Sequence, residues 1–129
     1  MATDFDCLFC KIASGAIPVK RLYETSDVLA FPDIHPQAPV HILLIPKQHF
    51  ASLTHCTAGE SSLLAQLLAA ACVVAQQQGL SVHPGGGGFR LVINTGPDGG
   101  QSVDHLHLHL LGGREMGCRP ARDSAWRLD

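Results

Sequence analysis

Hydrophobic and polar residues alternate with a period of two within residues 102–111 of the chain. There, His105, His107 and His109 each precede a leucine. Alternation of this kind is typical of a β-strand, because successive side chains leave a strand on opposite faces. The pattern therefore predicts a half-buried strand that directs its leucines into a core and its three imidazoles to the other face.

The rest of the pattern predicts two helices and further strands. Residues 57–79 contain a capping box, apolar residues at helical spacing and a terminating glycine, which together predict a long helix. A short helix that begins near Lys11 is expected to end at Gly15. Apolar runs predict strands at residues 23–24, 28–31, 41–46 and 89–94. An α+β architecture follows, with an antiparallel sheet of about five strands, one long helix and one short helix.

Composition limits the class of protein. The 129 residues, of which 46% are hydrophobic and 16% charged, are expected to fold as one globular domain, residues 1–129. A formal net charge of −2 offers no basic surface for a nucleic acid, so no such partner is expected. No membrane association is expected, because the longest apolar run is short and residues 1–6 do not resemble a leader. Five cysteines, an odd number, favour a reducing, cytoplasmic location over a disulfide framework.

Three aligned imidazoles suit two kinds of chemistry, metal binding and nucleophilic attack. The simpler alternative is that these histidines are ordinary solvent-exposed residues of a strand. On a regular strand, His105 and His109 would lie roughly 13 Å apart. A metal ion at about 2.0–2.1 Å from each nitrogen would accept all three only at a bend or bulge. The other chemistry is nucleophilic: a neutral central imidazole, His107, attacks an electrophile such as phosphorus while its neighbours hold the ring. We favour the nucleophile.

A glycine-rich loop precedes the histidines, from Asn94 to Ser102. Glycines such as Gly100 let the backbone approach a ligand closely, and consecutive amides in such turns can hold an anion. The loop contains no lysine or arginine, so a phosphate there would depend on backbone N–H groups, Ser102 and a protonated histidine. An ordinary tight connection between strands is the alternative, and the adjacent histidines favour the anion site.

The histidine stretch resembles the motif of a known family. His105-Leu-His107-Leu-His109-Leu-Leu matches the His-x-His-x-His pattern of the histidine triad (HIT) superfamily. Residues 33–49, 98–103 and 111–116 are similar to its HINT branch, the histidine triad nucleotide-binding proteins. The similarity covers a core of residues 7–116. The C-terminal tail, residues 117–129, departs from the family, in which the Gly-Gly-Arg-x-Met run usually continues into Trp-Pro-Pro-Gly.

The resemblance implies a HIT-like fold and a hydrolase that binds purine nucleotides such as AMP and GMP. It implies cleavage of nucleoside 5′-phosphoramidates through a covalent nucleotidyl-His107 intermediate, which releases a nucleoside monophosphate and an amine. Dinucleoside polyphosphate hydrolysis, nucleotidyl transfer and a largely non-catalytic nucleotide-binding scaffold are the alternatives. No cofactor is expected to be required for catalysis. The resemblance also implies a homodimer in which the sheet extends across the interface.

Matching positions in the family imply roles for further residues. Asp33 is expected to bind the ribose hydroxyls, since a carboxylate accepts two hydrogen bonds from a vicinal diol. His41 is expected to continue the proton network of the triad, unless it is an ordinary strand-end histidine. Polar contacts to the phosphate side of the nucleotide are expected from His109, Ser102, Gln101, Gly100 and Asn94. Three apolar residues are expected to enclose the base, with plain core residues as the alternative: Ile12, Phe31 and Ile34.

Cys7 and Cys10 form a C-x-x-C pair, which is typical of half a zinc site, a redox pair or two unrelated thiols. A redox pair favours a thioredoxin-like context, which the following sequence does not supply. Because no second C-x-x-C exists, zinc would need two further ligands. Some family members use histidines, and the matching positions here are His49 and His105. We expect a structural zinc on these four residues or an empty site, because many HINT proteins lack metal.

Overall fold

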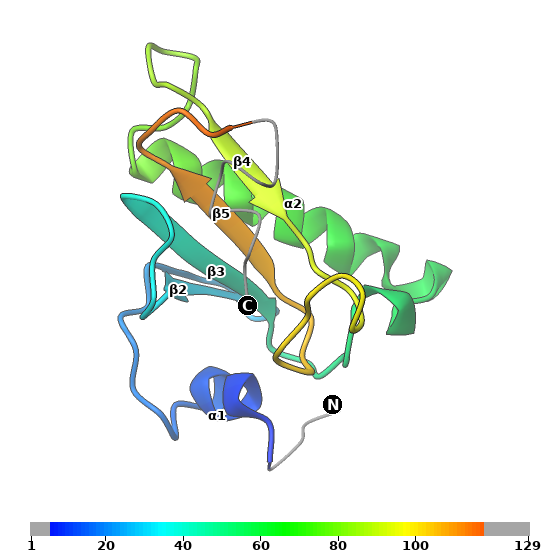
Figure 1. Cartoon of the computed structure of the whole chain (residues 1–129). Coiled ribbons are helices and arrows are strands. Elements are labelled where there is room, and N and C mark those ends of the chain that lie inside the picture. The colour runs from blue at the N-terminus through cyan, green and yellow to red at the C-terminus, as the bar shows by residue number, and fades with distance from the viewer. Residues whose placement is uncertain (1–5, 118–129) are drawn as a thin grey trace.

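The computed structural model describes residues 6–117. Five strands form one antiparallel sheet in the order β1-β2-β3-β5-β4 (Figure 1). The strands are β1 (Tyr23–Glu24), β2 (Val28–Pro32), β3 (Val40–Pro46), β4 (Phe89–Val92) and β5 (Leu108–Gly112). The α-helices and 3₁₀ turns are α1 (Leu8–Ser14), η1 (Leu53–His55), η2 (Ala58–Glu60) and α2 (Ser61–Gln77). The predicted α+β class, antiparallel sheet and pair of long and short helices are confirmed.

The two helices cover opposite faces of the sheet (Figure 1). Alternate residues of the central strands supply the two cores, because successive side chains point to opposite faces. A strand buried on both faces is apolar without interruption, which explains the unbroken runs in β2 and β3. One set packs with α2: Val28, Ala30, Ile42 and Leu44. The other set packs with α1: Leu29, Phe31, Leu43 and Ile45.

The strand predicted over residues 102–111 is shorter than expected, because β5 begins only at Leu108. Its pairing with β3 stops at Leu44, two residues before β3 ends at Pro46, which has no N–H to donate. The N–H of Leu106 instead donates to the carbonyl of Phe50 at 2.7 Å. His105 and His107 therefore lie before the strand, and the expected row of three histidines on one strand is wrong in this respect.

The alternation of side chains nevertheless persists through this segment. Leu106, Leu108 and Leu110 all join the core beneath α2. His105 and His107 face the other way and contact the ring of Phe9 on α1. The predicted division between leucines and histidines is therefore correct, although the hydrogen-bonded strand covers only part of it.

The helix boundaries follow capping signals in the sequence. Gly15, with φ of 88°, closes α1, and Gly79, with φ of 74°, follows α2. The short helix begins earlier than expected, because the Sγ of Cys7 accepts a hydrogen bond from the Cys10 N–H and so caps the first turn. The capping box at Thr57 opens η2, which runs directly into α2.

The segment Ala58–Gln77 is a helical stretch of 20 residues, long and apolar enough by length and composition to cross a membrane. This corrects the expectation that the longest apolar run of the chain is too short to cross a membrane. In the fold, Leu67 and Val74 on one side of the helix pack against the sheet. Leu68 and Val73 on another side remain exposed. The helix therefore serves as a core helix here and keeps a second apolar side at the surface.

Gln101 anchors the glycine-rich loop that precedes the histidines. Its Nε2 donates to the carbonyl oxygens of Ala51 at 2.7 Å and Val103 at 2.9 Å. Its Oε1 accepts a hydrogen bond from the N–H of Gly96 at 3.0 Å. The side-chain amide thus ties the loop to itself and to the segment after β3.

Replacing Gln101 with Ala should destabilise the fold, because the carbonyls of Ala51 and Val103 would lose their donor. We expect the free energy of unfolding in urea to fall by about 1–3 kcal/mol. Gln76→Ala, at an exposed position of α2, is the control and should change it by less than about 0.5 kcal/mol. Equal stability of the two variants would contradict an anchoring role.

Candidate active site

The three histidines converge on the α1 face of the sheet and are almost completely buried. Their exposed fractions are 0% for His105, 2% for His107 and 1% for His109. Of the three, only His109 belongs to β5, where it pairs with Leu43 of β3. The rings of His107 and His109 meet edge to face with centroids 5.0 Å apart. The ring of Phe9 lies against His107 at 5.1 Å. The imidazoles thus form one packed group.

A single hydrogen bond determines which nitrogen of His107 can react. The Nδ1 of His107 lies 2.7 Å from the carbonyl oxygen of His105. A carbonyl oxygen only accepts hydrogen bonds, so Nδ1 carries the hydrogen and donates it. The neutral ring then has its lone pair on Nε2. Because His107 also lines a pocket, this tautomer makes it a candidate nucleophile.

His41, on β3, extends the network to His109. The N–H of Gln37 donates to Nδ1 of His41 at 3.0 Å, so a neutral His41 carries its hydrogen on Nε2. That Nε2 lies 2.9 Å from Nδ1 of His109 and 3.4 Å from Oδ2 of Asp33. His109 therefore accepts at Nδ1, and its own hydrogen is on Nε2. An N–H of this kind suits a phosphate oxygen.

Asp33, His41 and His109 are also close enough together to be considered as metal ligands. The hydrogen bond from the Gln37 N–H to Nδ1 of His41 argues against this interpretation, because it places the hydrogen of the neutral ring on Nε2, the nitrogen that faces Asp33 and His109, and leaves no lone pair there for an ion. The group is better described as a proton network, in agreement with the role expected for His41.

A pocket of about 420 Å³ opens beside His107, with walls from α1, the residues after it and residues 31–37. Most of its lining is apolar, as is usual where a flat organic ring binds. Ile34 is 84% exposed, so it would contact a ligand from the open side, whereas Ile12 and Phe31 are buried. The predicted site residues that line the pocket are Ile12, Phe31, Asp33, Ile34, His41, Ser102 and His107.

Other predicted site residues lie outside the pocket lining. The ring of His109 contacts the rings of His107 and His41. Gly100, with φ of 81°, donates its N–H to the carbonyl of Pro97 within the loop. Asn94 and Gln101 are half-buried in the chain around that loop. Of these residues, Gln101 holds the segment that carries Ser102, through its hydrogen bonds to Ala51 and Val103.

Two residues that the sequence analysis did not single out belong to the site. Phe9 lines the pocket and contacts His107, and Gln37 fixes the tautomer of His41 through its backbone. A signal for Phe9 was available, since it lies three residues before Ile12 and shares its face of a helix. No signal pointed to Gln37, because any residue other than proline supplies a backbone N–H.

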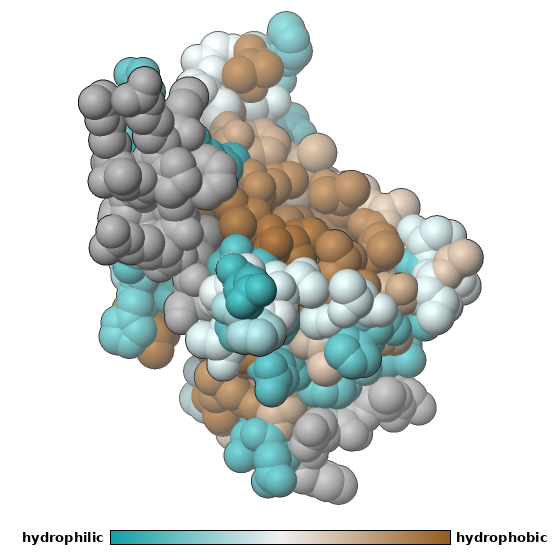
Figure 2. All heavy atoms as spheres, turned by 45° about the vertical axis from the view of Figure 1, so that its right-hand side comes forward, coloured by the Kyte–Doolittle hydropathy of each residue, from teal (hydrophilic) through white to brown (hydrophobic). Residues whose placement is uncertain are grey.

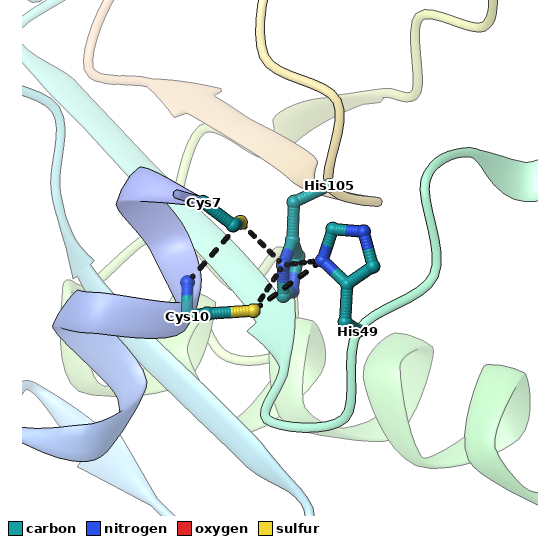
Figure 3. A group of neighbouring side chains, drawn as sticks. All are labelled: Cys7, Cys10, His49 and His105. Carbon is teal, nitrogen blue, oxygen red and sulfur yellow. Dashed lines mark hydrogen bonds between the residues drawn. The ribbon is translucent and has the colours of Figure 1, made fainter. Parts of the chain in front are cut away.

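Cys7, Cys10, His49 and His105 form a second group next to the triad (Figure 3). The side chains come from α1, from the segment after β3 and from the residues before β5, and they point toward one centre. Nδ1 of His105 lies 3.2 Å from Sγ of Cys7 and 3.5 Å from Sγ of Cys10. Nδ1 of His49 lies 3.3 Å from Sγ of Cys10 and 3.2 Å from Nδ1 of His105.

These donors fit a zinc ion. At the usual Zn–N and Zn–S distances, a nitrogen in a tetrahedral site lies roughly 3.3–3.6 Å from a neighbouring nitrogen or sulfur, close to the spacing of these N–N and N–S pairs. Nε2 of His105 donates to the carbonyl of Pro46 at 2.8 Å, so the lone pair of this ring is on Nδ1, inside the group. Burial lowers the pKa of His105 to about 4, which keeps the ring neutral as a ligand requires.

Comparison with known proteins agrees with the fold and the histidine motif. A model of the HIT domain matches residues 14–116. The chain is 49% identical over 117 residues to a 14 kDa zinc-binding protein of Brassica juncea, covering 89% of this chain and 99% of that protein. It is 47% identical over 120 residues to Adenylylsulfatase HINT1 of Arabidopsis thaliana, covering 92% and 78%, respectively.

A solved structure has the same fold. The crystal structure of a HIT family hydrolase from Legionella pneumophila matches with a TM-score of 0.84 and 50% sequence identity, covering 89% of this chain and 99% of that one. The histidine motif, the fold and the relatives agree. This chain belongs to the HIT family and is related to the hydrolases within it.

Proposed function

We propose that this protein hydrolyses the P–N bond of purine nucleoside 5′-phosphoramidates with His107 as the nucleophile. The observation that carries the proposal is the hydrogen bond from Nδ1 of His107 to the His105 carbonyl. It leaves the lone pair of a neutral, buried imidazole on Nε2, at the wall of a pocket large enough for a nucleotide. Covalent catalysis needs a nucleophile held in this way.

The lining of the pocket suggests how a nucleotide would lie. The base would stack among apolar side chains, between Ile12 and Phe31. The ribose hydroxyls would reach Asp33, whose side chain is 19% exposed and whose Oδ1 accepts a hydrogen bond from the N–H of His35. The phosphate would then lie near His107 and Ser102, two polar residues of the lining.

The proposed reaction has two steps. Nε2 of His107 attacks the α-phosphorus, the P–N bond breaks, and the leaving nitrogen takes up a proton and departs as an amine. Water then attacks the nucleotidyl-imidazole and gives up a proton, which releases the nucleoside monophosphate and restores the neutral ring. The His105 carbonyl stabilises the positive charge on the substituted imidazole by accepting the Nδ1 hydrogen throughout. His109 lies outside the lining but its ring is adjacent to that of His107, so its N–H would hold an oxygen of a phosphate bonded to His107.

Charge in the pocket favours an amine over a polyphosphate as the leaving group. Among the residues that the structure describes, no lysine or arginine lines the pocket, and Asp33 is its one acidic residue. A polyphosphate leaving group carries several negative charges and usually meets arginine, lysine or a metal ion. An amine needs no such partner, so the lining suits a phosphoramidate better than a dinucleoside polyphosphate.

Adenylyl sulfate is a second candidate substrate. The Arabidopsis relative is named an adenylylsulfatase, and its similarity covers 92% of this chain. Attack of His107 on the same α-phosphorus would release sulfate instead of an amine. The two substrates share the nucleotide and differ only in the leaving group, so they can be compared directly.

Turnover of three substrates tests the proposal: adenosine 5′-phosphoramidate, adenylyl sulfate and diadenosine tetraphosphate. We expect kcat/KM for the phosphoramidate to exceed that for the tetraphosphate at least about tenfold, because the tetraphosphate lacks charge-assisted hydrogen bonds here. Release of AMP is followed by chromatography. A higher kcat/KM for the tetraphosphate would contradict the proposal, and AMP binding without turnover of any substrate would favour the scaffold alternative.

A second copy of this chain is the proposed partner, with α2 and β4 forming the interface. Figure 2 shows apolar side chains gathered on the side of the molecule where these elements come forward. Leu68 of α2 is 51% exposed, Val73 is 37% exposed and Phe89 of β4 is 38% exposed. β4 is also an edge strand of the described sheet, and an open edge can pair with another strand. Pairing of two such edges would continue the sheet across a two-fold axis.

A charge placed on this face should dissociate the dimer. We expect Leu68→Glu to convert a dimer into a monomer, since an interface carboxylate would be desolvated without a partner. Light scattering coupled to size-exclusion chromatography measures the mass. Val82→Glu is the control, because Val82 is 57% exposed and lies beyond the end of α2. The interface is wrong if the wild type is a monomer or if Leu68→Glu remains a dimer.

A further inference from the structure

We infer that the zinc-binding group (Cys7, Cys10, His49 and His105) positions the nucleophile, holding His107 from two sides. On one side is the backbone of His105, and on the other is the ring of Phe9. The inference rests on the proposed function for the identity of the nucleophile. It assigns positioning roles to Cys7, Cys10 and His49, which lie outside the pocket lining.

The first link runs through His105. Its Nδ1 faces the two sulfurs and His49, and its Nε2 donates to the Pro46 carbonyl, so both ring nitrogens are engaged. Its carbonyl accepts the hydrogen from Nδ1 of His107. The residue that would bind the metal therefore also selects the tautomer of the nucleophile. A shift of the His105 backbone that follows loss of the metal would move this carbonyl.

The second link runs through α1. Phe9 lies between Cys7 and Cys10 in the first turn of the helix, so its backbone is fixed on both sides by ligands. Its ring stands edge-on to His107, with centroids 5.1 Å apart and an interplanar angle of 80°. Phe9 also lines the pocket, together with Ile12 from the next turn. The metal ligands thus determine where a pocket wall and a contact of His107 lie.

α1 needs this anchor because it is short. It has seven residues, and isolated helices of fewer than about 12 residues are marginal in water. Arg21 holds its C-terminal end, donating to the carbonyl of Ile12 at 3.0 Å and to that of Ala13 at 2.9 Å. At the N-terminal end, where Phe9 lies, the cap is the Sγ of Cys7, itself a member of the group. Metal binding would hold this cap in place.

The test removes one ligand that is remote from the pocket. His49→Ala is compared with His49→Cys, which keeps a zinc ligand at that position, and with His55→Ala, which removes an exposed histidine outside the group. Zinc content is measured by mass spectrometry of the metal after addition of Zn²⁺ and removal of excess. NMR of ¹⁵N-histidine-labelled protein reports the tautomer of His107, and this readout needs no substrate. The kcat and KM for adenosine 5′-phosphoramidate are measured on the same samples.

We expect the wild type and His55→Ala to bind Zn²⁺ and to show His107 with its hydrogen on Nδ1. His49→Ala should bind zinc at least about tenfold more weakly. Without zinc, its His107 should populate both tautomers, and kcat should fall about ten- to a hundredfold while circular dichroism remains that of a folded protein. His49→Cys should restore zinc binding, the Nδ1–H tautomer of His107 and kcat together. A purely stabilising metal would change only the thermal unfolding temperature.

Three results would overturn the inference: no Zn²⁺ binding by the wild type, an unchanged His107 tautomer in zinc-free His49→Ala, or restored zinc in His49→Cys without restored tautomer. If His49→Ala does not fold, the wild type stripped with a chelator under reducing conditions replaces it, and Zn²⁺ is added back. If the tautomer follows zinc but no phosphoramidate is hydrolysed, the proposed function fails and the inference stands. If turnover occurs but the tautomer of His107 does not depend on bound zinc, the inference alone fails.

Discussion

The hydrogen bond from Nδ1 of His107 to the carbonyl of His105 is the constraint on which the site depends. It exists because β5 begins only at Leu108, so the residues before it are outside the ladder with β3. Within a regular strand, carbonyls alternate between ladder partners, and a side chain from the same strand rarely competes for them. The late start of β5 therefore leaves the His105 carbonyl available to the imidazole of His107.

One stretch of chain contributes to the core and supplies the histidines of the candidate active site. Its leucines pack beneath α2, while His107 lines the pocket beside Phe9 of α1 and His105 belongs to the group with Cys7, Cys10 and His49. The histidines are buried without losing their hydrogen bonds, since His105, His107 and His109 each have a partner in the described structure. Buried polar groups that are fully satisfied rigidify a core and specify one arrangement. The hydrogen bonds that arrange the candidate active site are therefore also part of what stabilises the fold.

Local patterns predicted most of the fold and the composition of the site. Alternation separated leucines from histidines, and capping signals located the end of α1 at Gly15 and that of α2 within two residues of Gly79. The resemblance grouped Cys7, Cys10, His49 and His105, which the structure does bring together. The end of β5 was not predictable, because it depends on where its partner β3 stops. The hydrogen bonds of Gln101 were also hidden, since one of its partners, Ala51, lies 50 residues away in sequence.

The central claim is that His107 forms a covalent bond to the nucleotide, and intact-protein mass spectrometry of a quenched reaction tests it most directly. Wild-type protein mixed briefly with adenosine 5′-phosphoramidate should gain the mass of one adenylyl group, and fragmentation should place the group on His107. His107→Ala should show no adduct while it still binds AMP. Turnover by His107→Ala, or an adduct on another residue, would contradict the account.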